Sequence, residues 1–84
     1  MGGTDKGKSV RQVAFGDRVR QHRQRLGWSQ ETLAYEADIN RTYIASLEAG
    51  RRNPSLDLMA RLAAALGVDL GELVKGLQAK KGRA

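Results

Sequence analysis

Apolar residues recur three or four positions apart in five successive stretches of the chain, and this spacing predicts an all-α fold. A first helix is expected from about Val10 to Leu26, with Gly27 as its left-handed stop. Gly16 lowers helix propensity by ~1 kcal/mol relative to alanine and could mark where the helix proper begins. The inward stripe of this helix is predicted to contain Val13 or Ala14, Phe15, Val19, His22 and Leu26.

The stretch from Ser29 to Gly50 predicts two short helices joined by a tight turn. Ser29 and Asn40 are favourable N-caps, and Gly50 suits the left-handed position after the second helix. Each cap stands beside an apolar pair that can form a hydrophobic staple, which supports both starting points. The staples are Trp28 with Leu33 and Ile39 with Ile44. The residues predicted to face inward are Leu33, Ala34, Ala37, Ile44 and Leu47. Those predicted to lie on the opposite side of the second helix are Arg41, Thr42, Ala45 and Ser46.

Two more helices are predicted in the last third of the chain. Ser55 caps a helix that runs to about Leu66, and Asp69 with Glu72 has the spacing of a capping box for a fifth helix. The fifth helix carries an apolar stripe that its first part is too short to bury alone. The stripe either folds back onto the domain's own core or forms a two-fold dimer interface. Leu70 and Leu73 fit both interpretations, whereas Val74 and Leu77 favour the interface.

Residues 29–50 resemble the helix-turn-helix of the Cro/C1-type (lambda-repressor-like, XRE) DNA-binding domain. The matching features are SQ at the start, LA four residues later, NRTYI opening the second helix, LE-x-G at its end and RRNPSL after it. The resemblance covers about residues 13–74 and implies a compact five-helix lambda-repressor-like fold. Asp38 replaces the usual glycine of the turn, and aspartate tolerates a left-handed backbone better than most residues. The NRTYI run and the short helical layout are also similar to controller proteins of restriction–modification systems.

The same resemblance implies an ion pair between Arg23 and Glu48. In the family an arginine four residues before the glycine that ends the first helix pairs with a glutamate near the end of the second motif helix. Arg23 and Glu48 stand at these positions. The pair would hold the first helix against the recognition helix and would neutralise a carboxylate that otherwise repels phosphates.

Composition limits the chemistry and the location that can be expected. The chain has no cysteine, which excludes a disulfide framework and a thiolate metal site and fits a reducing compartment. It has no apolar run long enough for a membrane span and no signal-peptide core in MGGTDKGKS, so a cytoplasmic location without a membrane partner is expected. His22 is the only histidine and is expected to be packed or solvated, so neither a metal nor another cofactor is predicted.

The formal net charge of +6 is unevenly distributed. We expect a disordered arm at residues 1–9, a Cro/C1-type domain at 10–78 and a basic tail at 79–84. Within the domain, ten Lys and Arg stand against eight Asp and Glu, so the two tails carry most of the excess. Basic tails are more often solvated than functional. The argument for nucleic acid therefore rests on Arg41, which opens the second motif helix, and on Arg51 and Arg52, which follow it.

Helix geometry assigns the expected contacts with double-stranded DNA. The second helix of such a motif enters the major groove with its N-terminal residues nearest the base edges, so residues about 41–49 form the recognition helix. Arg41 is expected to bind guanine, and Thr42 can pack its methyl group on thymine. The expected base contacts are Arg41, Thr42, Ala45, Ser46 and Asn40. The expected phosphate contacts are Gln30, at the start of the first motif helix, and Tyr43, Arg51, Arg52 and Asn53.

The sequence favours three classes of function unequally. A sequence-specific transcriptional regulator, binding as a homodimer to a two-fold-related operator, agrees best with these features. An interaction module with the same fold, such as an antitoxin or a coactivator-like adaptor, is the alternative. An enzyme is disfavoured because the chain has one histidine, no cysteine and no phosphate-cradling glycine loop. No small-molecule ligand is expected either.

Overall fold

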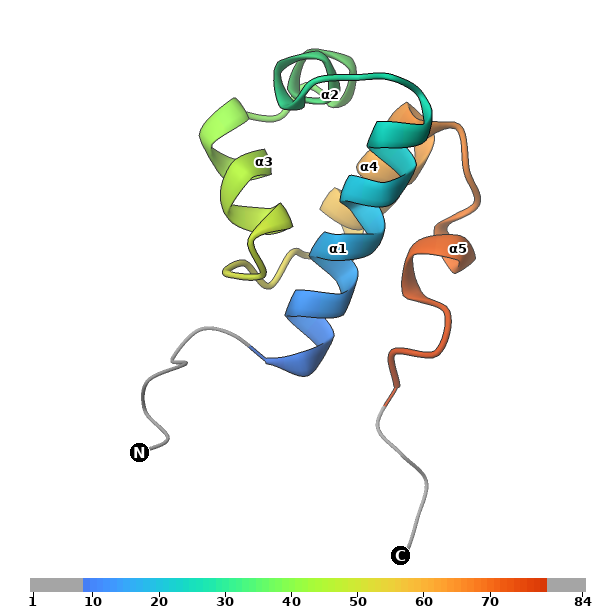
Figure 1. Cartoon of the computed structure of the whole chain (residues 1–84). Helices are drawn as coiled ribbons and strands as arrows, with labels where there is room; N and C mark the ends of the chain where they lie inside the picture. Colours follow the sequence, from blue (N-terminus) through green and yellow to red (C-terminus); the bar gives the residue numbers. More distant parts are fainter. Residues whose placement is uncertain (1–8, 79–84) are drawn as a thin grey trace, which may run out of the picture.

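The computed structural model describes residues 9–78, and these residues form five helices and no strand, as the apolar spacing predicts (Figure 1). The expected arm, apart from Ser9, and the expected tail lie outside the described residues. No helix of the described part is long and apolar enough to cross a bilayer. The helices are α1 (Val10–Arg25), α2 (Gln30–Ala37), α3 (Arg41–Glu48), α4 (Leu56–Leu66) and α5 (Leu70–Val74).

Helix α1 begins earlier than the position of Gly16 suggests. Ser9 is its N-cap and accepts a hydrogen bond from the backbone N–H of Gln12, so Ser9 belongs to the domain and not to the arm. Gly16 lies inside the helix and is buried. A Cβ atom at this position would lie 2.1 Å from the carbonyl oxygen of Leu47 in α3. The glycine therefore permits close packing of α1 against α3, and its interpretation as a helix start is wrong.

The two caps of the motif are where the sequence places them. The Ser29 side chain accepts from the N–H of Thr32, and the Asn40 side chain accepts from the N–H groups of Thr42 and Tyr43. Between the two helices, Asp38 has φ 57° and ψ 49°, which is the left-handed conformation that a glycine usually adopts here. Arg61 of α4 donates a hydrogen bond to the carbonyl of Asp38 at 3.1 Å, which ties the turn to the rest of the domain.

All five helices contribute to one core, formed by the buried side chains of Phe15, Val19, Leu33, Ala34, Ala37, Ile44, Leu47, Leu62, Ala63, Leu66 and Leu73. The predicted inward stripe of α1 is partly wrong. Leu26 is 46% exposed because it lies beyond the last residue of α1. Of the two alternatives Val13 and Ala14, Val13 is 47% exposed and Ala14 is half-buried. Arg23 takes a buried place on the inner face of α1 instead.

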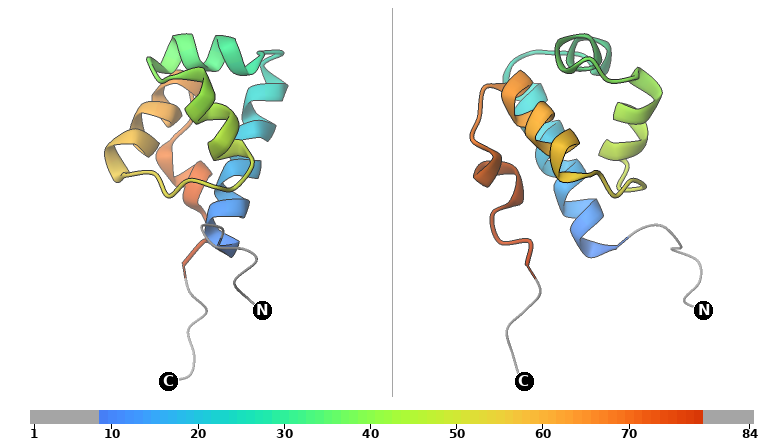
Figure 2. Two further views of the ribbon diagram at one scale, coloured as in Figure 1. Left: turned by 90° about the vertical axis from the view of Figure 1, so that its left-hand side faces the viewer. Right: turned by 180° about the vertical axis from the view of Figure 1, so that it is seen from behind.

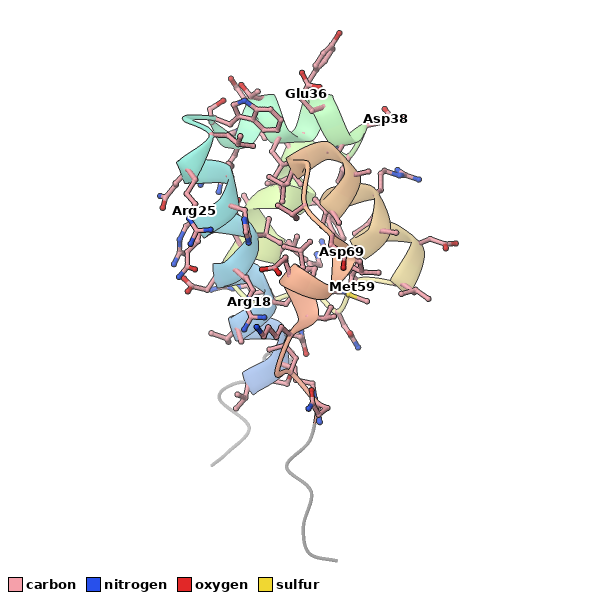
Figure 3. The ribbon with its side chains drawn as sticks, turned by 90° about the vertical axis from the view of Figure 1, so that its right-hand side faces the viewer. Arg18, Arg25, Glu36, Asp38, Met59 and Asp69 are labelled. Atoms are coloured by element: carbon pink, nitrogen blue, oxygen red, sulfur yellow. The ribbon has the colours of Figure 1, made fainter. Side chains whose placement is uncertain are left out.

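Helix α5 is shorter than its apolar stripe predicts. It ends at Val74, and the chain then turns through Gly76, which has φ 75°. Arg18 of α1 points toward this segment (Figure 3) and donates hydrogen bonds to the carbonyls of Leu73 and Lys75, at 3.4 and 2.7 Å. Leu77 therefore follows the helix instead of continuing it.

The structure changes the prediction for the C-terminal stripe. Leu73 is fully buried in the core of its own domain, so its side chain cannot contact a partner, and its place in a dimer interface is wrong. Leu70, Val74 and Leu77 are half-buried and remain accessible. These three residues are called the C-terminal apolar surface below.

We predict that Gly16→Ala destabilises the domain, by about 1–3 kcal/mol, because the added methyl group overlaps the backbone of α3. Chemical unfolding monitored by circular dichroism measures this change. Gln24→Ala is the control, since Gln24 is exposed on the same helix. A Gly16→Ala variant at least as stable as the native chain would contradict the packing described here.

Candidate nucleic-acid interface

Helix α3 lies on the outside of the domain with α2 crossing above it, and one view of the molecule looks directly onto it (Figure 2, left). Its inner side chains, Ile44 and Leu47, are fully buried. On its outer side, Arg41 and Thr42 are exposed, and Ala45 and Ser46 are half-buried. The helix thus presents to solvent the residue types that can read base edges, while its apolar face fixes its orientation.

The first turn of α3 is held by Asn40. Its Oδ1 atom accepts hydrogen bonds from Thr42 N at 2.7 Å and from Tyr43 N at 3.3 Å. The capping oxygen is therefore used within the protein, and only the amide nitrogen of Asn40 is left to meet a base or a phosphate. At the same end of α3, the Nε atom of Arg41 lies 3.7 Å from the Oε2 atom of Glu31 in α2.

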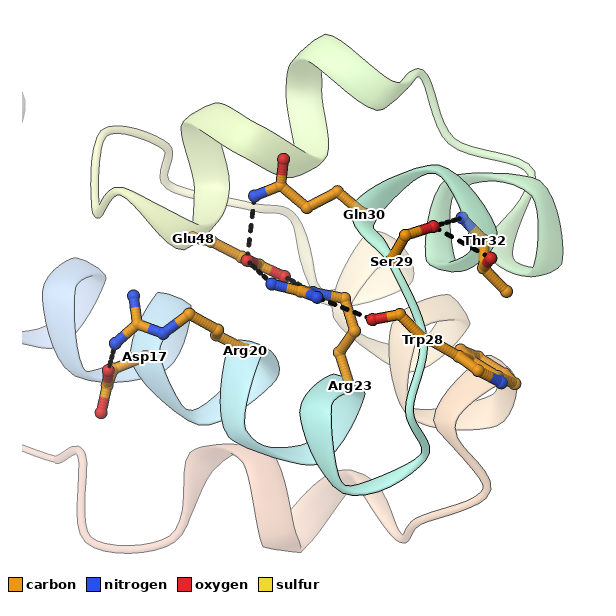
Figure 4. Close-up of polar contacts among 8 residues, drawn as sticks. All are labelled: Asp17, Arg20, Arg23, Trp28, Ser29, Gln30, Thr32 and Glu48. Carbon is orange, nitrogen blue, oxygen red and sulfur yellow. Dashed lines mark hydrogen bonds and ion pairs between the residues drawn. The ribbon is translucent and has the colours of Figure 1, made fainter.

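The other end of α3 is anchored by the ion pair expected of Arg23 and Glu48 (Figure 4). Nε and Nη2 of Arg23 donate to the two carboxylate oxygens of Glu48 at 2.7 and 2.8 Å, which is bidentate geometry. Nη1 of Arg23 donates to the carbonyl of Trp28 at 2.8 Å. Both charged residues are buried, with 9% and 5% of their surfaces exposed. One guanidinium therefore joins α1, the segment before α2, and α3.

Hydrogen bonding to Glu48 raises the pKa of Arg23, while burial acts in the opposite direction. A raised arginine pKa stabilises the fold fully at every pH below the unfolded value and ceases to do so only as the pH rises through the folded value. The Arg23 guanidinium therefore stays charged near neutral pH. Its titration makes no contribution to the pH dependence of folding stability in that range.

Gln30 takes part in the same network, which the sequence did not indicate. Its Nε2 atom donates to Oε1 of Glu48 at 3.1 Å, and its side chain is half-buried. One amide hydrogen is thus used inside the protein. In the first turn of α2 the N–H of Thr32 is used by the Ser29 cap. An anion at this helix end would therefore be bound mainly by the backbone N–H groups of Gln30 and Glu31 and by the helix dipole.

Of the remaining expected phosphate contacts, Tyr43 lies in the first turn of α3 and the other three follow the C-terminal end of this helix. Arg51, Arg52 and Asn53 are exposed, and the loop they form is tied to α3 by a hydrogen bond from Arg51 N to Ser46 O at 3.0 Å. The Arg52 guanidinium lies over the half-buried ring of Tyr43, 4.9 Å from its centre. The stacking restricts the side chain of Arg52. Two exposed cationic groups therefore follow the C-terminal end of α3.

Comparison with known proteins identifies relatives of this chain. The sequence model of the helix-turn-helix family matches residues 19–73. The control protein C.BamHI of Bacillus amyloliquefaciens is 46% identical over 63 residues, which cover 74% of this chain and 78% of the relative.

Solved structures show the same similarity in three dimensions. The restriction-modification controller protein C.AhdI of Aeromonas hydrophila has a TM-score of 0.75 and 42% identity, covering 77% of this chain and 98% of that one. SinR, a master regulator for biofilm formation, was solved in complex with DNA. It has a TM-score of 0.70 and 31% identity, covering 73% of this chain and 98% of that one.

We predict that Arg23→Met lowers the free energy of unfolding by about 3–5 kcal/mol, because it leaves the buried carboxylate of Glu48 without its charged partner. The control is Arg25→Met on the same helix, since Arg25 is exposed. Urea unfolding of both variants makes the comparison. Equal losses in the two variants would mean that the buried pair has no special part in stability.

Proposed function

Since the chain belongs to the Cro/C1-type (XRE) helix-turn-helix family and is a DNA-binding transcriptional regulator, we propose that it binds its operator as a homodimer, with α3 of each protomer in the major groove. The observation that carries the proposal is the exposed outer side of α3, which begins with Arg41 and Thr42 at a capped helix end. We place this activity in the cytoplasm and assign it no catalytic step.

Recognition of bases is assigned to the outer face of α3. The guanidinium of Arg41 can donate two hydrogen bonds to O6 and N7 of guanine, and the methyl group of Thr42 can contact thymine. Ala45 and Ser46 lie one turn further along the same helix and complete the reading face. Asn40 contributes through its free amide nitrogen.

Phosphate contacts are assigned to both sides of that face. The start of α2 at Gln30 offers backbone N–H groups and a positive helix dipole. Arg51, Arg52 and Asn53 follow the C-terminal end of α3, and Tyr43 positions Arg52. Such contacts fix the register of the helix on the duplex but do not read sequence.

Dimerisation is assigned to the C-terminal apolar surface, formed by Leu70, Val74 and Leu77. Val74 and Leu77 also line a shallow cleft with Phe15 and Met59, so the apolar area extends beyond α5. A single small domain makes a limited interface with DNA, and two copies on half-sites about 10 base pairs apart would provide the affinity of a specific regulator. The alternative of an antitoxin or adaptor has less support, because the relatives named above are controllers and regulators.

The proposal as a whole is tested by selecting duplexes from a random DNA pool with the purified protein. The expected result is one enriched sequence with two-fold symmetry. A protein that enriches no double-stranded sequence would overturn the proposal.

We predict that Arg41→Ala weakens binding to the selected duplex by about 1–3 kcal/mol and changes binding to random DNA much less, because a guanine contact is lost. Fluorescence anisotropy titrations measure both affinities. Arg52→Ala is the matched control, since it removes a phosphate contact: both affinities should fall alike, and the slope of log K against log salt should decrease by about one unit. If Arg41→Ala behaves like Arg52→Ala, Arg41 contacts phosphate and not guanine.

We also predict that Leu77→Asp converts the dimer to a folded monomer, because a carboxylate would be buried in the interface. Sedimentation velocity gives the mass, and circular dichroism checks the fold. Leu56→Asp is the control, since Leu56 is a 65% exposed leucine outside the C-terminal apolar surface. An unchanged mass for Leu77→Asp would place the interface elsewhere.

A further inference from the structure

Glu31 and Arg41 form an ion pair across the two helices of the motif. Glu31 lies in the first turn of α2, and Arg41 is the first residue of α3. Their side chains are 77% and 59% exposed, and the distance between Arg41 Nε and Glu31 Oε2 is 3.7 Å. An ion pair this exposed contributes little to folding. Its position beside the residue that is assigned to read guanine suggests a different role.

We propose that Glu31 is a positioning residue that aims Arg41 at a base and keeps it away from phosphates. The inference rests on the proposed function, in which Arg41 reads the major groove. It goes further by assigning sequence discrimination to a side chain of α2 that is not itself assigned to touch DNA.

The geometry of the guanidinium supports the positioning. Arginine has five N–H donors in a planar fork, and the Nε side and the terminal Nη1–Nη2 edge face different directions. Glu31 lies at the Nε side of Arg41. The terminal edge is left free, and two parallel N–H groups on one edge match O6 and N7 of guanine. Glu31 thus occupies the part of the guanidinium that a base contact does not need.

The negative charge of Glu31 also favours contact of Arg41 with a base over contact with a phosphate. A phosphate that approaches Arg41 also approaches the carboxylate of Glu31, and the two anions repel each other. A guanine edge is uncharged and meets no such repulsion. The pair therefore weakens contacts of Arg41 with the DNA backbone, which occur on every sequence, more than it weakens its contact with guanine.

A purely structural role for Glu31 predicts effects that do not depend on Arg41. An acidic residue in the first turn of α2 interacts favourably with the helix dipole whether or not Arg41 is present. It would also repel phosphates from the start of α2 independently of Arg41. A test must therefore show that the effect of Glu31 on discrimination requires Arg41.

The readout is the ratio of the affinity for the selected duplex to the affinity for a scrambled duplex, measured by anisotropy titration at one salt concentration. Glu31→Gln, which removes the charge and keeps the shape, should lower this ratio by about threefold. The same substitution in an Arg41→Ala background should change the ratio by less than about 1.5-fold, since no guanidinium remains to be aimed. Thermal unfolding of each variant shows that all are folded at the temperature of the titrations.

Glu36→Gln is the matched control. Glu36 is an exposed glutamate on the same helix (Figure 3), roughly 140° around the helix axis from Glu31. Its substitution by glutamine changes the net charge of the protein by the same amount as Glu31→Gln. It should leave the ratio unchanged. An unchanged ratio in Glu31→Gln, an equal fall in the Arg41→Ala background, or an equal fall in Glu36→Gln would each overturn the inference. Loss of the proposed function itself has a separate signature, because the native chain would then prefer no duplex over its scrambled form.

Discussion

The buried ion pair between Arg23 and Glu48 is the interaction on which the rest of the site depends. It crosses from α1 to the last residue of α3, and the same guanidinium binds the carbonyl of Trp28 just before α2. Removing two charges from water is unfavourable, and only a complete set of hydrogen bonds offsets that cost. The bidentate contact, the Trp28 carbonyl and the amide of Gln30 supply this set. Gly16 adds the close approach of the α1 and α3 backbones.

In this arrangement, one end of α3 packs against the domain and the other end carries the side chains assigned to base recognition. Its inner face packs in the core and its last residue is paired with α1, whereas the two residues that begin it, Arg41 and Thr42, have exposed side chains. The buried end, at Glu48, holds α3 against α1. The open end carries Arg41 and Thr42, the side chains assigned to base edges. Neutralising Glu48 with Arg23 also removes a negative charge from the helix that we propose to enter the major groove.

The sequence predicts the helices, the caps and the inner faces because these depend on neighbours three or four residues apart. Ser29, Asn40 and the left-handed Asp38 are examples. It mispredicts Gly16, Leu73 and the length of α5, because each depends on residues far away in the chain. Gly16 meets Leu47, Leu73 enters the common core, and Arg18 binds the carbonyls that follow Leu73. The pair of Glu31 and Arg41 has no local signal either, since the left-handed turn between α2 and α3 brings the two residues together.

The most direct test of this arrangement is a titration of the ¹⁵N-labelled protein with its selected duplex, followed by amide chemical shifts. The result expected is that the largest shifts occur at Arg41, Thr42 and Ser46, with further shifts at the start of α2 and in the loop after α3. Shifts confined to α4 and α5, with α3 unaffected, would contradict it.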